Sequence, residues 1–242
     1  MRRIRLATAP AALFGAFVLL ALIAFLPLRL ILGIAGVGDA GLSARAAEGS
    51  VWAGRLRDAR FGDVALGDLD AHLSPWPLLV GRARIALDSV TDTPVQTLHG
   101  ALGVSRTGVR ADDLSATIAP GRLFAPLPVT ALMLDAVSVR FEDGACMAAE
   151  GRVRATLAGD FAGVALPQAL SGAIRCEGKT LLVPLSSQAG AERVDLRIDG
   201  DGRYRATVAL QPADAAGLAR LATLGFVQGA GGYVLSIEGR FR

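Results

Sequence analysis

The longest hydrophobic stretch of the chain spans residues 6–28 and contains no charged side chain. About 20 helical residues are enough to cross the roughly 30 Å hydrocarbon core of a bilayer, because a helix pairs all of its backbone groups internally. The stretch therefore predicts a single transmembrane helix over residues 6–28. Arg2, Arg3 and Arg5 precede it, and the positive-inside rule keeps such a basic N-terminus in the cytoplasm.

A cleaved signal peptide is the alternative interpretation of this N-terminus. Its apolar region is usually about 7–15 residues long and is followed closely by a small-x-small cleavage site. Here the apolar pattern resumes after Arg29, and the small-x-small triplet Ala44-Arg45-Ala46 lies well downstream. These lengths favour an uncleaved anchor.

After the anchor, short runs of alternating hydrophobic and polar residues recur between glycine-rich turns. This pattern is typical of antiparallel sheet with one face in water. The clearest hairpin covers residues 193–210 and turns at Gly200-Asp201-Gly202, whereas residues 212–224 carry leucines at helical spacing and predict one short helix. We therefore expect an all-β domain, either a curved antiparallel sheet or a sandwich, with one short helix. The expected division is residues 1–5 cytoplasmic, 6–28 transmembrane, 29–48 linker, and 49–242 β-rich domain.

The positive charge of the chain belongs to its anchor. The formal net charge is +3, but four of the 25 Lys and Arg residues lie at or before Arg29, and the first acidic residue is Asp39. The remaining chain carries 21 basic and 22 acidic side chains, with no basic cluster interleaved with aromatic residues. A nucleic-acid partner is therefore not expected.

Cys146 and Cys176 are the only cysteines, and both follow the anchor. An even number of cysteines in an oxidising compartment predicts a disulfide, and two separate buried thiols are the alternative. On the chain-entropy model, closing a loop of about 30 residues stabilises a fold by roughly 3–4 kcal/mol.

Four candidate chemical sites are better explained as structure. Gly178-Lys179-Thr180 resembles the end of a phosphate-binding loop but lacks the earlier glycine and a following helix. Asp199-Gly200-Asp201-Gly202 resembles the start of a calcium loop, but arginines occupy the later ligand positions. His72 and His99 have no partner at metal-ligand spacing. We therefore predict no catalytic, cofactor-binding or metal-binding residues and no enzymatic activity.

The two tryptophans, Trp52 and Trp76, are assigned to packing. Pro75 and Pro77 flank Trp76, and two prolines exclude a central strand, so a bend is expected there.

Several short motifs, in their order along the chain, resemble the type II secretion system protein N (GspN) family. They are the Gly49-Ser50-Val51-Trp52-Ala53-Gly54 segment, the segment from Pro75-Trp76 to Gly81, Leu170-Ser171-Gly172 with Cys176 and Gly178, Gly200-Asp201-Gly202 with Tyr204, and Leu224-Gly225-Phe226 with Gly232-Tyr233. The motif positions we expect to be structurally important are Gly49, Trp52, Gly54, Trp76, Gly81, Gly178, Tyr204, Gly232 and Tyr233.

The resemblance implies an accessory component of the bacterial inner membrane that assists the export of folded proteins across the outer membrane. It implies a single-pass chain with a periplasmic β-rich domain, other secretion-system subunits as partners, and no catalytic residues or cofactor. Similar β segments also occur in AsmA-like envelope proteins, whose curved sheets handle lipid. A periplasmic lipid-binding groove is therefore the alternative function.

Overall fold

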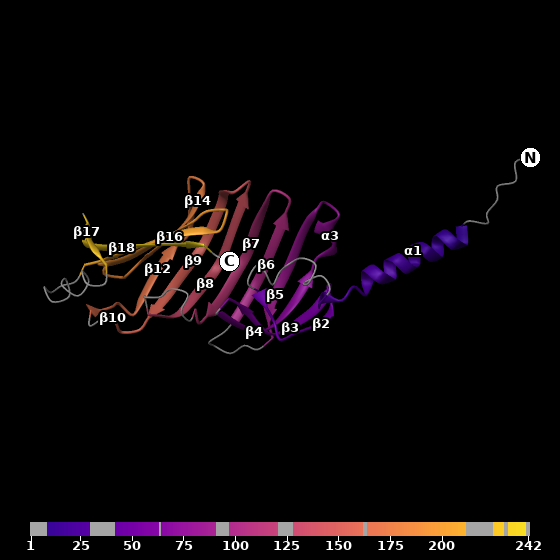
Figure 1. Ribbon diagram of the computed structural model, residues 1–242, viewed down its shortest axis with the longest axis horizontal. Helices are drawn as coiled ribbons and strands as arrows, with labels where there is room; N and C mark the ends of the chain where they lie inside the picture. Colours follow the sequence, from indigo (N-terminus) through magenta and orange to yellow (C-terminus); the bar gives the residue numbers. More distant parts are fainter. Residues whose placement is uncertain are drawn as a thin grey trace, which may run out of the picture.

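In the computed structural model, helix α1 (Ala9–Ala24) is followed by a long antiparallel sheet (Figure 1). The structure describes residues 9–29, 42–62, 64–90, 97–120, 128–161, 164–211, 225–229 and 232–240. The helical elements are α1 (Ala9–Ala24) and the single turn α3 (Pro75–Leu78). The strands of the first half are β1 (Leu42–Ser43), β2 (Ala46–Ser50), β3 (Ala53–Phe61), β4 (Val64–Leu73), β5 (Arg82–Ser89), β6 (Thr97–Ser105), β7 (Gly108–Ile118), β8 (Val129–Glu142) and β9 (Ala145–Leu157). Those of the second half are β10 (Asp160–Phe161), β11 (Val164–Ala165), β12 (Ala169–Ala173), β13 (Arg175–Glu177), β14 (Thr180–Ser186), β15 (Glu192–Ile198), β16 (Arg203–Leu210), β17 (Val227–Gly229) and β18 (Gly232–Arg240).

The main sheet is antiparallel and follows the sequence almost without crossovers. Its strand order is β1-β3-β4-β5-β6-β7-β8-β9-β12-β14-β15-β16-β18-β17, with β2 paired to β3 and β13 paired to β14. β10 and β11 form a separate small hairpin. The predicted hairpin at residues 193–210 is confirmed, because β15 pairs with β16 from Glu192↔Leu210 to Ile198↔Tyr204. The all-β prediction is confirmed, since every described strand except β10 and β11 belongs to this one antiparallel sheet, which is curved (Figure 1).

The alternation of side chains decides which face of the sheet is buried. In β9, Val153, Ala155 and Leu157 are buried while Arg152 and Arg154 between them are exposed, which is the period-two pattern of a strand with one wet face. Bulges shift the register of the long strands β7, β8 and β9. At two of them the hydroxyls of Ser115 and Ser138 accept hydrogen bonds from the backbone N–H groups of Ala136 and Asp113, at 3.1 and 3.0 Å.

A single sheet can bury a core here because it curls along its length. The strands are steep beside α1 and nearly horizontal at β16 and β18 (Figure 1), as accumulated strand twist requires. The curl brings the β15–β16 turn onto the β8–β9 turn, where a Cβ on Gly200 would lie 2.5 Å from the carbonyl oxygen of Gly144. The apolar side chains gather into three clusters, centred on Leu69 and Leu56 near α1, on Val153 and Val183 in the middle, and on Val208 and Phe226 at the far end.

The N-terminal helix is shorter than the predicted span at its C-terminal side. α1 ends at Ala24, because Pro27 disfavours helical geometry in the residue before it and has no N–H for a helical hydrogen bond. Within the described residues, no helix combines the length and the apolar character that crossing a membrane requires. The transmembrane prediction for residues 6–28 is not confirmed, and the part before Ala9 lies outside the described residues.

Two other predicted boundaries have different outcomes. Within the linker expected over residues 29–48, β1 and β2 begin the sheet at Leu42 and Ala46 and pair with the longer β3. The helix predicted over residues 212–224 lies outside the described residues.

Candidate interaction site at the ends of the sheet

The first hairpin of the sheet holds the segment that follows α1. The N–H of Val51, in the β2–β3 turn, donates to the carbonyl of Leu26 at 2.9 Å, and Pro27 forms a bridge with Ser50. Leu28 is then buried against the hairpin, and its side chain occupies the space in front of Gly54, where a Cβ would lie 2.5 Å from Leu28 Cδ2. The chain leaving α1 is therefore fixed to the sheet by backbone pairing as well as by packing.

The motif residues of this hairpin have distinct roles. Gly49 has a φ of 81°, and a side chain on it would meet the carbonyl oxygen of Ala53 at 2.5 Å, so only glycine fits there. Trp52 packs against the buried cluster of Leu56 and Leu69, which confirms its assignment to packing. Gly54 is required by the close approach of Leu28. The sequence motif therefore forms the part of the sheet that holds the segment joining α1 to it.

The assignment of Trp76 to packing is wrong. Its side chain is 79 % exposed, and its neighbours Leu79 and Val80 are exposed at 77 % and 71 %. The predicted bend is present as α3, which Pro75 opens at the first helical position, where its fixed φ and missing N–H are tolerated. This single turn lifts its side chains away from the sheet before Gly81 leads into β5. Proline spacing could predict the turn, but not its orientation.

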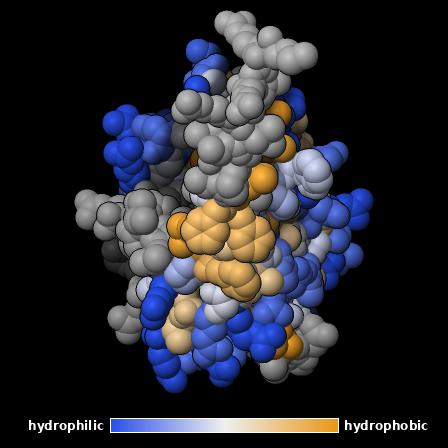
Figure 2. Space-filling model, turned by 90° about the vertical axis from the view of Figure 1, so that its right-hand side faces the viewer, coloured by the Kyte–Doolittle hydropathy of each residue, from blue (hydrophilic) through white to orange (hydrophobic). Residues whose placement is uncertain are grey.

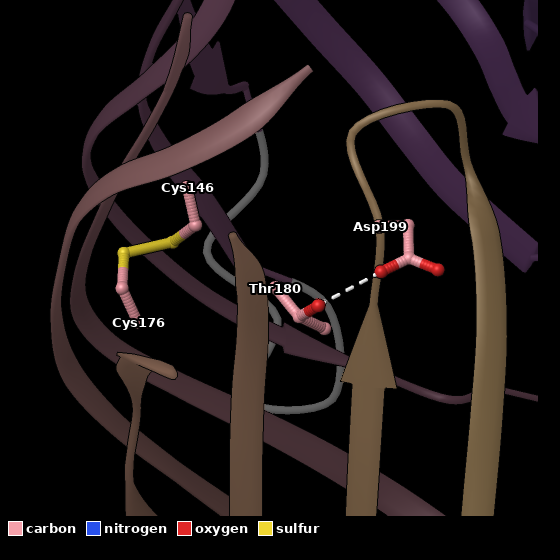
Figure 3. Close-up of a disulfide and its surroundings, with 4 residues drawn as sticks. All are labelled: Cys146, Cys176, Thr180 and Asp199. Carbon is pink, nitrogen blue, oxygen red and sulfur yellow. Dashed lines mark hydrogen bonds between the residues drawn. A yellow bond between two sulfur atoms is a disulfide. The ribbon is translucent and has the colours of Figure 1, made fainter. Parts of the chain in front are cut away.

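The disulfide prediction is confirmed, and the bond joins two strands that are not paired with each other. Cys146 of β9 and Cys176 of β13 are bonded, with their Cα atoms 5.6 Å apart (Figure 3). Pairing between β9 and β12 stops at Ala173, so the disulfide and the hydrogen bond from the N–H of Cys146 to the carbonyl of Lys179, at 2.8 Å, replace the ladder beyond it. The Gly178-Lys179 turn is therefore structural, as predicted.

The same region fixes the next hairpin. The hydroxyl of Thr180 donates to Asp199 Oδ1 at 2.9 Å, as Figure 3 shows beside the disulfide. Asp201 Oδ1 accepts from the N–H of Arg203, so the acidic residues around Gly200 serve the turn. Within the described residues, no group of three potential metal ligands is present.

The last strands form the far end of the sheet. Tyr204 lies opposite Gly239 across β16 and β18, and the absence of a side chain on Gly239 makes room for the tyrosine ring. A side chain does not fit at Gly232, because its Cβ would lie 2.6 Å from the carbonyl oxygen of Leu210. Tyr233 packs on the cluster that contains Val208. These motif residues shape the strands, and their side chains do not form a shared binding site.

The outer edge of β18 is an open backbone surface of the described chain. β18 pairs with β16 along its length, but with β17 only over Gly232–Val234. Within the described ranges, residues 235–240 have no strand beside their outer edge. Such an edge presents unpaired N–H and C=O groups to another chain.

The charged and histidine side chains of the described strands take part in surface contacts. His99 lies 3.3 Å from Asp88 and His72 lies 3.3 Å from the carbonyl of Trp52, all on exposed strands. Arg55 donates two hydrogen bonds to Asp70 across β3 and β4, at 2.7 and 3.2 Å. These bonds lower the pKa of the Asp70 carboxyl below its ordinary value, an effect expected of a surface ion pair.

Apolar side chains are exposed at the end of the molecule from which α1 projects. Figure 2 views this end and shows an apolar patch surrounded by hydrophilic side chains. The exposed residues of α1 include Leu13, Phe14, Phe17 and Leu22. A helix that is apolar on its described exposed positions is suited to an apolar surrounding.

Comparison with known proteins identifies one family. The model of the family "Type II secretion system (T2SS), protein N" matches residues 40–236, which include the whole described sheet except the last strand's final residues. Searches of curated proteins and of solved structures find no match.

Proposed function

Because the chain belongs to the type II secretion system protein N family, and so is a component of that secretion system, we propose that it is an accessory subunit of the inner membrane. In this role it assists assembly of the machine, or export of folded proteins across the outer membrane, by binding other subunits. The observation that carries this proposal is the open edge of β18, which offers six residues of backbone for strand addition.

The proposed topology has α1 and the apolar residues around it in the bacterial inner membrane. The N-terminus is cytoplasmic and the sheet is periplasmic. The uncharged run of residues 6–28 after three arginines supports this, as does the disulfide, which belongs to an oxidising compartment. Confinement to the membrane surface raises the effective concentration of the sheet near other anchored subunits. The paired backbone at Leu26 and Val51 then limits the orientations that the sheet can take.

Site-specific photo-crosslinking tests the binding edge. A photoreactive residue at Ser236, exposed on β18, is expected to crosslink to another secretion subunit in cells that assemble the machine. The matched control is the same residue at Arg154, which is also exposed but lies on β9 in the middle of the sheet. Equal crosslinking from both positions, or none from Ser236, would show that the β18 edge is not the binding surface.

A lipid-handling groove is the second candidate, and one observation favours it. Ile85, Leu102, Val104 and Val109, each at least 39 % exposed, form neighbouring positions across β5, β6 and β7 on the face that continues into the core. Against it, the hollow that Val104 and Val109 help to line is shared with Arg84, Arg110 and Arg140 and has a volume of about 230 Å³, below the roughly 300–1,000 Å³ of ordinary ligand pockets. Mass spectrometry of the native chain decides: stoichiometric phospholipid would favour the groove.

A further inference from the structure

The β4–β5 connection, residues 74–81, exposes apolar side chains that no described residue covers. Leu78, Leu79 and Val80 accompany Trp76 in this loop, and all four are at least 40 % exposed. Solvent-exposed apolar residues scattered singly need no explanation, but a cluster on one short turn marks a contact surface. Tryptophan in particular is enriched where a protein meets the boundary between lipid and water.

A chain of hydrogen bonds places this loop at the base of α1. The carbonyl of Leu26 accepts from the N–H of Val51, the carbonyl of Val51 accepts from the N–H of Leu73, and α3 begins two residues later. The N–H of Ser74 in turn donates to the carbonyl of Arg84, which holds the loop against β5. The loop and the segment that follows α1 are therefore fixed to the same corner of the sheet (Figure 1).

Beside the loop, the wet face of the sheet is basic. Arg84, Arg110 and Arg140 lie in one row across the sheet, with Gly103 between the first two, and Arg82 lies in the adjacent row. These four arginines line a single hollow together with Pro77 and Val80.

Two acidic side chains offset part of this charge. Asp112 pairs with Arg84 at 3.3 Å, and Glu142 pairs with Arg140 at 3.6 Å. In the part of the chain that the structure describes, Arg82 and Arg110 have no ion-pair partner. The hollow therefore keeps unpaired positive charge next to an exposed apolar loop, the combination that binds an anionic bilayer surface.

We propose that residues 74–81 form a second membrane contact, in which the apolar side chains enter the interface of the bilayer and Arg82 and Arg110 face the phosphates of anionic lipids. The inference rests on the proposed anchoring by α1. Its consequence is that two contacts, α1 and this loop, fix the tilt of the sheet on the membrane, and so the direction in which the β18 edge points.

Quenching of tryptophan fluorescence by bromine-labelled lipids tests this contact. The full chain is placed in vesicles of equal parts phosphatidylcholine and phosphatidylglycerol, with Trp52→Phe leaving Trp76 as the single reporter. Two further reporters, each alone in a chain with both natural tryptophans replaced by Phe, are Phe17→Trp in α1 and Val227→Trp, which is 67 % exposed at the far end of the sheet. We expect strong quenching at positions 76 and 17 and none at 227.

The reporters separate failure of this contact from failure of the anchor. Quenching at position 17 without quenching at position 76 would overturn the loop contact but not the anchor. Absence of quenching at both positions would overturn both the loop contact and the anchoring by α1. Quenching at 227 as strong as at 76 would also overturn the contact, because the sheet would then be adsorbed without preference.

Substitution of the arginines tests the charged part of the contact. Arg82→Gln with Arg110→Gln is expected to lower the ratio of membrane-bound to free loop about 5-fold per arginine in vesicles with phosphatidylglycerol. No change is expected in pure phosphatidylcholine. The control pair, Arg152→Gln with Arg154→Gln, removes two exposed arginines of β9 and should have no effect. An equal loss in both pairs would refute a specific role for the hollow.

Discussion

One methyl group added at Gly54 should weaken the packing of Leu28, and so of the segment after α1, against the sheet. In Gly54→Ala the new Cβ would lie 2.5 Å from Leu28 Cδ2 and 2.9 Å from the carbonyl oxygen of Ser50. Gly54 does not have a positive φ, so an alanine is not excluded by its backbone conformation. The cost of the substitution therefore comes from crowding alone.

The size of the effect follows from the burial of Leu28, which is only 6 % exposed. Displacing a leucine from such a site forfeits about 1.5–3 kcal/mol of burial, and overpacking of a core costs about 1–3 kcal/mol. The two estimates describe the same rearrangement, so we expect Gly54→Ala to lower the free energy of unfolding by about 2 kcal/mol. Leu28→Ala alone should cost about 2–4 kcal/mol.

The assay is urea unfolding of the full chain in detergent micelles, followed by fluorescence of Trp52 in a Trp76→Phe background. Trp52 reports the correct region because it packs on the same cluster as Leu28. The control is Gly159→Ala, since a Cβ on Gly159 would meet nothing within 4 Å and its backbone has no positive φ. This control should not destabilise the protein.

A double-mutant cycle refutes or supports the reasoning. If the methyl group acts through Leu28, Gly54→Ala should cost at least about 1 kcal/mol less when Leu28 is already Ala. Additive effects of the two substitutions would mean that the leucine is not seated against Gly54.

Three other perturbations test separate parts of the structure. Replacing both Cys146 and Cys176 by Ser should lower the free energy of unfolding by about 3–4 kcal/mol and remove the response to reductant, and an unchanged urea midpoint would contradict this. The hydrogen bonds from Arg55 lower the pKa of Asp70 in the folded state, so their stabilisation is present above the unfolded pKa of about 4 and disappears as the pH falls through the folded value. Asp70→Asn should therefore lower the urea midpoint at neutral pH, and the difference from the wild-type midpoint should vanish in acid. A difference that does not depend on pH would contradict the role of Asp70. Gly172→Ala would press a Cβ into the backbone of β14 and should cost about 1–3 kcal/mol in urea unfolding, in contrast to the Gly159 control.

The sheet could be predicted from the sequence wherever side chains alternate within one strand pair. The hairpin of β15 and β16 is the clearest case, because Val194, Leu196 and Ile198 share a face and a glycine-rich turn follows. Cys146 and Cys176 could be paired because they are the only cysteines. Alternation shows that a strand has a dry face, but not what covers it, and so the choice between a curled sheet and a sandwich remained open.

The interaction surfaces were harder to predict because they depend on which elements meet. Trp76 is a residue type that is usually buried, and it is exposed here because of the orientation of α3 relative to β4. Leu28 lies at the end of the apolar run that predicts a membrane span, yet its side chain is buried in the cluster that contains Leu56 and Leu69. The row of Arg84, Arg110 and Arg140 comes from three strands, and its one sequence signal is that each arginine occupies a polar position of an alternating strand.

Co-purification from detergent-solubilised membranes tests whether the anchored chain binds other secretion-system subunits. The full-length chain is compared with a chain that lacks residues 1–24 and is directed to the periplasm. The cut follows Ala24 because the next residues pair with the sheet, where the N–H of Val51 donates to Leu26. Our account predicts that the full-length chain recovers other secretion-system subunits and that the shortened chain loses them. Undiminished recovery by the shortened chain, or recovery of phospholipid without those subunits, would contradict the account.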